Sequence, residues 1–258
     1  MTFINFQPKD HFNILLNTGD GTTNKSFTGV GFQPDMIWNK IRSTTYAHWM
    51  YDAVRGAGAE KEISPNGTAG MGDNDNAQYG YISSFDSDGF TLGSSGETNS
   101  NNDTYASWNW KANGSGSSNT DGSINTTATS VNTTSGVSIS TYSGTGSAAT
   151  IGHGLGAIPQ VMIVKNTYQA EHWIVYHHKI ATTPQDKYIR LNDTGSRADF
   201  PMWNDTAPTA SVFSVGTSTS VNQGGGTFVA YCFAEKKGFS KFGSYTGNGN
   251  TDGTFVYT

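Results

Sequence analysis

Short stretches in which apolar and polar residues alternate recur along the chain, separated by clusters of glycine, serine and asparagine. Two of them, Thr104–Ala112 (TYASWNWKA) and Thr227–Glu235 (TFVAYCFAE), combine aromatic, β-branched and small residues. Alternation with a period of two is typical of a strand with one face buried. Apolar positions at helical spacing are interrupted by Gly, Pro or β-branched clusters. We therefore predict an all-β protein.

The same pattern occurs twice, at a nearly constant offset. The two stretches begin 123 residues apart (227 − 104 = 123), and Pro34 and Pro159 are 125 apart. The pair His48-Trp49 returns 124 residues later as His172-Trp173. A Thr/Ser-Gly-x-Gly turn precedes each proline and occurs a third time at Thr246–Gly249. A repeat of this kind indicates one folding unit that is used more than once.

The repeat divides the chain into five segments: an arm at residues 1–10, a β-module at 11–112, a linker or meander at 113–135, a second β-module at 136–236, and a tail at 237–258. We expect each module to be an antiparallel β-sandwich. The linker is almost wholly Gly, Ser, Asn, Thr and Asp, so it has little side chain to bury. The tail either completes the second module or starts a third copy. We favour the front of a longer array, because the match continues past the Gly-Asn-Gly turn.

The offsets also predict which residues are equivalent in the two modules. We expect Trp49 to superpose on Trp173, and Trp108 on Tyr231. These pairs should lie on equivalent strands if the repeat is structural.

Trp110 and its counterpart Phe233 occupy the same phase of the two repeated strands. We expect both to be core residues, so truncation of Trp110 to alanine should cost about 3–5 kcal/mol. An unchanged melting temperature would instead indicate an exposed ring that serves as a ligand platform.

Charge and composition exclude several classes of partner. The net charge is −5, and the 15 Lys and Arg residues are spread over the chain, whereas a phosphate-binding surface needs them clustered. Nucleic acid is therefore an unexpected partner. The N-terminal sequence MTFINFQPKDHF has no signal-peptide pattern, and no apolar run approaches the roughly 18 residues of a membrane span, so we expect no membrane insertion. The single cysteine, Cys232, has no internal disulfide partner and favours assembly in a reducing cytoplasm.

Aromatic and imidazole side chains at and just after the repeated His-Trp pair are candidates for carbohydrate binding. Exposed Trp and Tyr rings bind the apolar faces of sugars, and two copies would give a bivalent site. The alternative is that each Trp fills the core of its module and each His binds a backbone carbonyl. The candidate residues are His48, Trp49, Tyr51, His172, Trp173 and Tyr176.

Neither a metal site nor a catalytic site is well supported. Asp86 and Asp88 resemble the start of a calcium loop, in which alternate carboxylates supply oxygen ligands. The later bidentate Glu is missing, so an Asp-Gly turn is the alternative. Glycoside hydrolysis needs two carboxylates, and the only alternating pair, Glu60 and Glu62, is expected in a loop. We expect no cofactor and no enzymatic activity.

Several motifs together resemble a known family. GFQPDMIWNK, YDAVRG, SFDSDGFTLG, TYASWNWKA and AYCFAEKKGFSKFGSYTGNGNTDGTFVYT are similar to the repeated module of marine tailed-phage (cyanophage-type) structural proteins. The resemblance covers residues 11–258 in order. It implies a virion or tail-fibre-like protein with a lectin-like β-sandwich of the concanavalin A or jelly-roll type, and it carries over no binding residues.

The resemblance suggests a structural protein on the exterior of a tailed-phage virion, as a fibre or tail appendage with lectin-like adhesion to host-surface glycan. A capsid decoration protein without a ligand is the alternative, and a carbohydrate-active β-sandwich enzyme is disfavoured. The expected partners are other virion proteins and further copies of the chain, as a trimer if it is a fibre. The expected location is the virion surface after assembly in the host cytoplasm.

Overall fold

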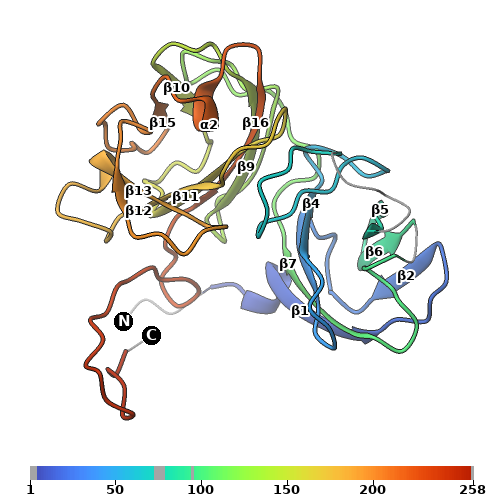
Figure 1. Cartoon of the computed structure of the whole chain (residues 1–258). Coiled ribbons are helices and arrows are strands. Elements are labelled where there is room, and N and C mark those ends of the chain that lie inside the picture. The colour runs from blue at the N-terminus through green and yellow to red at the C-terminus, as the bar shows by residue number, and fades with distance from the viewer. Residues whose placement is uncertain (1–4, 73–78, 94–95, 257–258) are drawn as a thin grey trace.

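The computed structural model describes residues 5–72, 79–93 and 96–256, and shows a chain built almost wholly of antiparallel strands (Figure 1). The expected all-β class is confirmed. Residues 1–4 of the predicted arm and residues 257–258 of the predicted tail lie outside the described residues. The helical elements described are short: η1 (Pro8–Asp10), η2 (Pro184–Asp186) and α2 (Thr219–Asn222).

The first half of the chain forms two antiparallel sheets. The larger sheet has the order β1 (Phe12–Thr18), β7 (Thr104–Trp110), β3 (Met36–Ile41), β4 (His48–Asp52). The smaller sheet has the order β2 (Lys25–Thr28), β6 (Gly89–Leu92), β5 (Ile82–Asp86). A buried cluster that includes Ile37, Trp49 and Tyr51 of the larger sheet with Phe27 and Phe90 of the smaller one fills the space between them. This half is therefore a β-sandwich.

The second half repeats the arrangement with additional strands at both edges. Its larger sheet has the order β14 (Ala198–Asp199), β13 (Lys187–Arg190), β12 (Ile174–His177), β11 (Val161–Asn166), β16 (Thr227–Phe233), β9 (Val137–Ser143), β8 (Ala128–Asn132). Its smaller sheet pairs β10 (Ala149–Gly152) with β15 (Val212–Val215). A second buried cluster, which includes Tyr142, Trp203 and Phe213, lies within this half.

The strand registers of the two halves are the same. Phe12 pairs with Trp110 in the first half and Val137 pairs with Phe233 in the second, with offsets of 125 (137 − 12) and 123 (233 − 110). The sheet β1-β7-β3-β4 thus matches β9-β16-β11-β12. Trp108 and Tyr231 also fall at equivalent positions, because they face residues 14 and 139 of the matching strands.

The expected equivalence of Trp49 and Trp173 is wrong by one residue. Asn39 pairs with Trp49, whereas its counterpart Val164 pairs with Ile174. Trp49 is therefore equivalent to Ile174, and Trp173 lies one position earlier. Since side chains alternate along a strand, a slip of one residue moves the ring to the other face of the sheet.

The segment at 113–135 is a meander that belongs largely to the second module. Its residues 128–132 form β8, which pairs with β9. Isolated bridges join Ser117 to Thr129 and Ile124 to Ile151. These backbone bonds compensate for the lack of large side chains.

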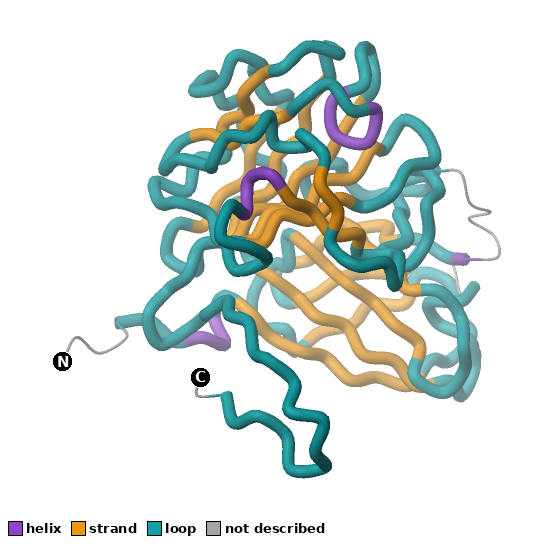
Figure 2. Tube along the Cα trace, turned by 60° about the vertical axis from the view of Figure 1, so that its left-hand side comes forward, coloured by secondary structure: helices purple, strands orange, loops and turns teal. Residues whose placement is uncertain are grey.

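The described part of the tail forms no strand, so a third sandwich does not begin to assemble within it. A bridge between Lys236 and Ser240 opens the segment, and Tyr245, Phe255 and Val256 are exposed. In Figures 1 and 2 the end of the tail extends away from both modules. The predicted third copy stays a prediction.

Candidate functional site

The outer faces of the two larger sheets meet at a buried joint between the modules. Because successive side chains of a strand point to opposite faces, Ile37 of β3 enters the first sandwich while Met36 and Trp38 point outward. Met36 lies in one apolar cluster with Tyr231 and Trp173 of the second module. We call this contact region the intermodule joint.

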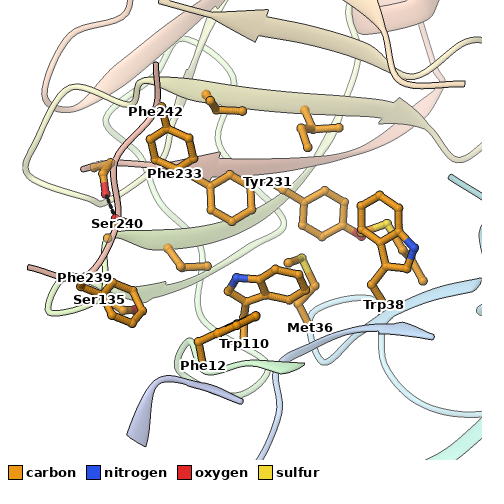
Figure 3. Close-up of a pocket in the computed structure, with 16 residues that line it drawn as sticks. Phe12, Met36, Trp38, Trp110, Ser135, Tyr231, Phe233, Phe239, Ser240 and Phe242 are labelled. Atoms are coloured by element: carbon orange, nitrogen blue, oxygen red, sulfur yellow. Dashed lines mark hydrogen bonds between the residues drawn. The ribbon is translucent and has the colours of Figure 1, made fainter. Parts of the chain in front are cut away.

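An apolar cavity of about 360 Å³ lies in the intermodule joint (Figure 3). The two modules line it from equivalent positions, since the strand offsets of 125 and 123 relate one set of lining residues to the other. These equivalent pairs are Phe12 and Val137, Met36 and Val161, Trp38 and Ile163, and Trp110 and Phe233. Trp110 and Phe233 are only half-buried, so the cost of truncating Trp110 should fall below the range expected for a core ring.

The tail covers part of this cavity. Phe239 and Phe242 line it, and the Phe242 ring lies 6.2 Å from that of Phe233. The Phe242 amide donates to Glu235 Oε1 at 2.9 Å. Phe239 contacts Phe6 of the N-terminal arm, with ring centroids 5.4 Å apart. The beginning of the tail and the arm are therefore held together beside the cavity.

Ser135 places a buried hydroxyl at the cavity wall. Its Oγ has no hydrogen-bond partner among the described residues. A buried polar group without a partner costs about 1–3 kcal/mol. The same cost makes the hydroxyl a point at which a bound group could form a hydrogen bond.

Ser135→Ala should therefore leave the free energy of unfolding unchanged or raise it by about 1 kcal/mol. Ser138→Ala is the matched control, because the Ser138 hydroxyl is buried but donates to the His153 carbonyl at 2.6 Å. That control should lower the free energy of unfolding by about 1 kcal/mol. Urea denaturation measures both, and a loss for Ser135→Ala equal to the control's would show that the hydroxyl is paired in solution.

A buried polar contact also crosses the intermodule joint. Tyr231 of the second module donates to Asp52 Oδ2 of the first at 2.6 Å, and Arg55 Nε donates to the same oxygen at 2.6 Å. Burial raises the pKa of the Tyr231 phenol well above its ordinary value, and the adjacent Asp52 carboxylate adds to the shift. Burial alone would lower the pKa of Arg55, but the Asp52 carboxylate outweighs it and keeps the guanidinium charged.

The loop after β4 binds the second module through backbone groups. Trp173 Nε1 donates to the Ser64 carbonyl at 2.9 Å, and Lys165 Nζ donates to the Thr68 carbonyl at 3.1 Å. The Met71 amide donates to the Thr167 carbonyl at 2.9 Å. These directional bonds fix the orientation of the two modules as well as their contact.

The four aromatic candidates for carbohydrate binding are all buried, which contradicts their proposed role as exposed platforms. Trp49, Tyr51, Trp173 and Tyr176 are each at most 3% exposed. Trp49 and Tyr51 lie in the first sandwich core, Tyr176 lies in the second, and Trp173 lies in the intermodule joint. A sugar cannot stack on rings that the protein already covers. The core interpretation holds for Trp49, whereas Trp173 is buried between the modules and not in the core of its own module.

The two histidine candidates have partners within the chain. His48 Nδ1 accepts from Trp38 Nε1 at 2.9 Å, and His172 Nδ1 lies 3.1 Å from Asn192 Nδ2. Burial lowers the pKa of His48. Each histidine is thus bound within its own module, and the four rings lie in three different clusters, so the six residues do not form one site.

Asp86 and Asp88 form the turn that was the alternative to a calcium loop. Asp88 accepts from the amides of Gly29 and Gly31, at 3.1 and 2.6 Å. Asp86 accepts from the hydroxyls of Ser84 and Thr91, both at 2.7 Å. Over residues 5–72, 79–93 and 96–256, no group of three or more His, Cys, Asp or Glu side chains could hold a metal ion.

Sequence reasoning missed the residues that make the joint. Asp52 and Arg55 lie in the motif YDAVRG, where their spacing of three residues is compatible with an ion pair, but Tyr231 is 179 residues away. Ser135 is the last residue of segment 113–135, whose many similar small polar residues give no reason to single out one serine. The tail carried one available signal, because Phe239 and Phe242 are aromatic residues close together in a segment rich in glycine and polar residues.

The fold and the intermodule joint define a class: an all-β protein of two equivalent antiparallel sandwiches packed through their larger sheets. The chain belongs to the family described as Domain of unknown function (DUF7483), whose model matches residues 7–258. No curated protein and no solved structure matches the chain. Within the described residues, none of the helices has the length and apolar character needed to cross a membrane.

Proposed function

We propose that this protein is a non-enzymatic structural component on the exterior of a tailed-phage virion, as a fibre or a tail appendage. The observation that carries the proposal is the intermodule joint, in which Asp52, Arg55 and Tyr231 form a buried contact between two equivalent modules. A buried charged pair is stable only when its geometry is held in place. A chain that has to bear load or present a surface at a fixed distance needs such a rigid connection between modules.

The resemblance of the repeated motifs to phage structural modules supports the virion setting. The protein's partners are then other virion proteins and further copies of itself, and its location is the virion surface. Capsid decoration is the alternative placement. In that placement the N-terminal arm could serve as the anchor to the shell. Phe6 of the arm contacts Phe239 of the chain's own tail, so the arm would have to detach before binding a shell.

A specific observation favours adhesion as a second function of the same protein. Tyr46, between β3 and β4, and Tyr168, between β11 and β12, are 46% and 63% exposed in corresponding loops of the two modules. Lys40 Nζ and Lys165 Nζ hold these loops by donating to the backbone carbonyls of Thr44 at 3.3 Å and Glu171 at 3.1 Å. Exposed tyrosine rings on firmly held loops suit shallow contacts with host glycan.

Antibody-gold labelling of particles purified from infected cells tests the structural role. We expect the protein to co-purify with intact particles and the label to lie on a fibre or tail appendage. Label spread over the capsid would favour decoration. A protein found only in the soluble fraction of the lysate would contradict both placements.

Glycan-array binding tests the adhesive role separately. The double variant Tyr46→Ala/Tyr168→Ala should lose binding that the unmodified chain shows, while the variant with the partly exposed Trp108→Phe should retain it. Binding that survives the double variant would exclude these two loops.

A further inference from the structure

Strand β1 leaves one edge of the first module's larger sheet open. In the described chain it pairs with β7 on one side and with no strand on the other. The equivalent strand of the second module, β9, pairs with β16 on one side and with β8 on the other. The same edge is thus covered in one module and open in the other.

The open edge carries exposed apolar side chains. Ile14 is 48% exposed and Leu16 is 62% exposed, whereas Ile139, the counterpart of Ile14, is fully buried. The sequence of β1, FNILLNT, contains no charge and no proline, which are the usual devices that keep an edge strand from pairing. The Ile14 amide donates to the side chain of Asn13 at 2.9 Å, so it is turned away from the β7 ladder.

We propose that β1 pairs antiparallel with β1 of a second copy of this chain, about a twofold axis through Leu15. In this register Ile14 lies opposite the partner's Leu16, and Asn13 lies opposite the partner's Asn17, because both pairs of numbers add up to 30. The sequence of β1, FNILLNT, has nearly the same order of apolar and polar residues when read in either direction. That self-complementarity favours a second copy over an unrelated strand.

The pairing gives hydrogen-bond partners to the open backbone edge of β1, as β8 does for the equivalent edge of β9. All seven residues of β1 find a partner in this register, and the backbone groups of Ile14 and Leu16 face the new ladder. The exposed Ile14 and Leu16 side chains then lie on the same face as those of the partner, and apolar cross-strand neighbours stabilise a sheet. The two larger sheets become one continuous sheet across the axis.

This contact closes at two copies, so it differs from the trimer expected for a fibre, and it does not depend on a virion role. A monomeric chain that is nevertheless found on particles would overturn the dimer and leave the structural role standing. A dimeric protein that is absent from particles would overturn the structural role and leave the dimer standing.

Light scattering after size-exclusion chromatography tests the proposal on the full chain. We expect a mass of twice the 27.6 kDa of one chain, reduced to that of one chain by Leu16→Lys. Thr141→Lys is the matched control, because it changes the equivalent outward position of β9, which β8 already covers, and it should keep the dimer. A chain that stays monomeric at millimolar concentration overturns the proposal.

Disulfide trapping reports the register. Leu15→Cys should form a covalent dimer under mild oxidation, whereas Asn13→Cys should not, because its predicted neighbour is the partner's Asn17. The native Cys232 does not interfere, since it is buried and burial raises the pKa of its thiol to about 12. Circular dichroism verifies that each variant is folded. A dimer that survives Leu16→Lys but is lost on deletion of residues 243–258 would assign the contact to the tail and overturn the pairing of β1.

Discussion

Replacement of Arg55 by methionine should destabilise the protein by about 3–5 kcal/mol, measured as the free energy of unfolding in urea. The change leaves the Asp52 carboxylate buried at the joint without its cation. The Tyr231 hydroxyl remains as a donor, but a neutral donor does not compensate for a buried charge.

The chain contains a matched control for this variant. Arg190 and Asp193 form an ion pair with the same spacing of three residues, but both side chains are about a third exposed. Arg190→Met should therefore cost less than about 1 kcal/mol. Adding Asp52→Asn to Arg55→Met should recover part of the loss, because it removes the uncompensated charge. Equal costs for the two arginine variants would show that the pair at the joint is solvated.

Replacement of Trp173 by alanine should cost about 3–5 kcal/mol and uncouple the two modules. The ring is fully buried in the intermodule joint, lies 6.5 Å from the Tyr231 ring, and donates to the Ser64 carbonyl of the first module. Differential scanning calorimetry should show one transition for the unmodified chain and two for the variant.

Trp203 supplies the control for Trp173. It is also fully buried and donates from Nε1 to a carbonyl, that of Lys187, but it belongs to the core of the second module. Trp203→Ala should lower the stability of the second module by a similar amount without loosening its contact with the first. If Trp173→Ala kept a single sharp transition, the ring would not couple the modules.

The β class and the repeat could be predicted from sequence because they depend on local alternation and on a constant offset. The position of Trp173 could not. Seven residues separate Lys40 from His48 and six separate Lys165 from His172, so aligning the identical His-Trp pairs hides a slip of one residue. The ladder is set by backbone pairing, of Asn39 with Trp49 and of Val164 with Ile174, and it places the two rings on opposite faces.

The proposed carbohydrate site failed for a related reason. Repetition of an aromatic residue is expected both from a binding function and from a folding requirement, and sequence does not distinguish them. Tyr51 and Tyr176 are truly equivalent, and both are core residues of their sandwiches. The joint itself arises only when the modules pack, since Asp52 meets Tyr231 across 179 residues.

Residual dipolar couplings of backbone amides test most directly whether the two modules form one rigid unit. Couplings from residues 12–110 and from residues 137–233 should fit a single alignment tensor with the modules oriented as in Figure 1. Separate tensors for the two ranges would show that the modules move independently and would contradict the rigid joint.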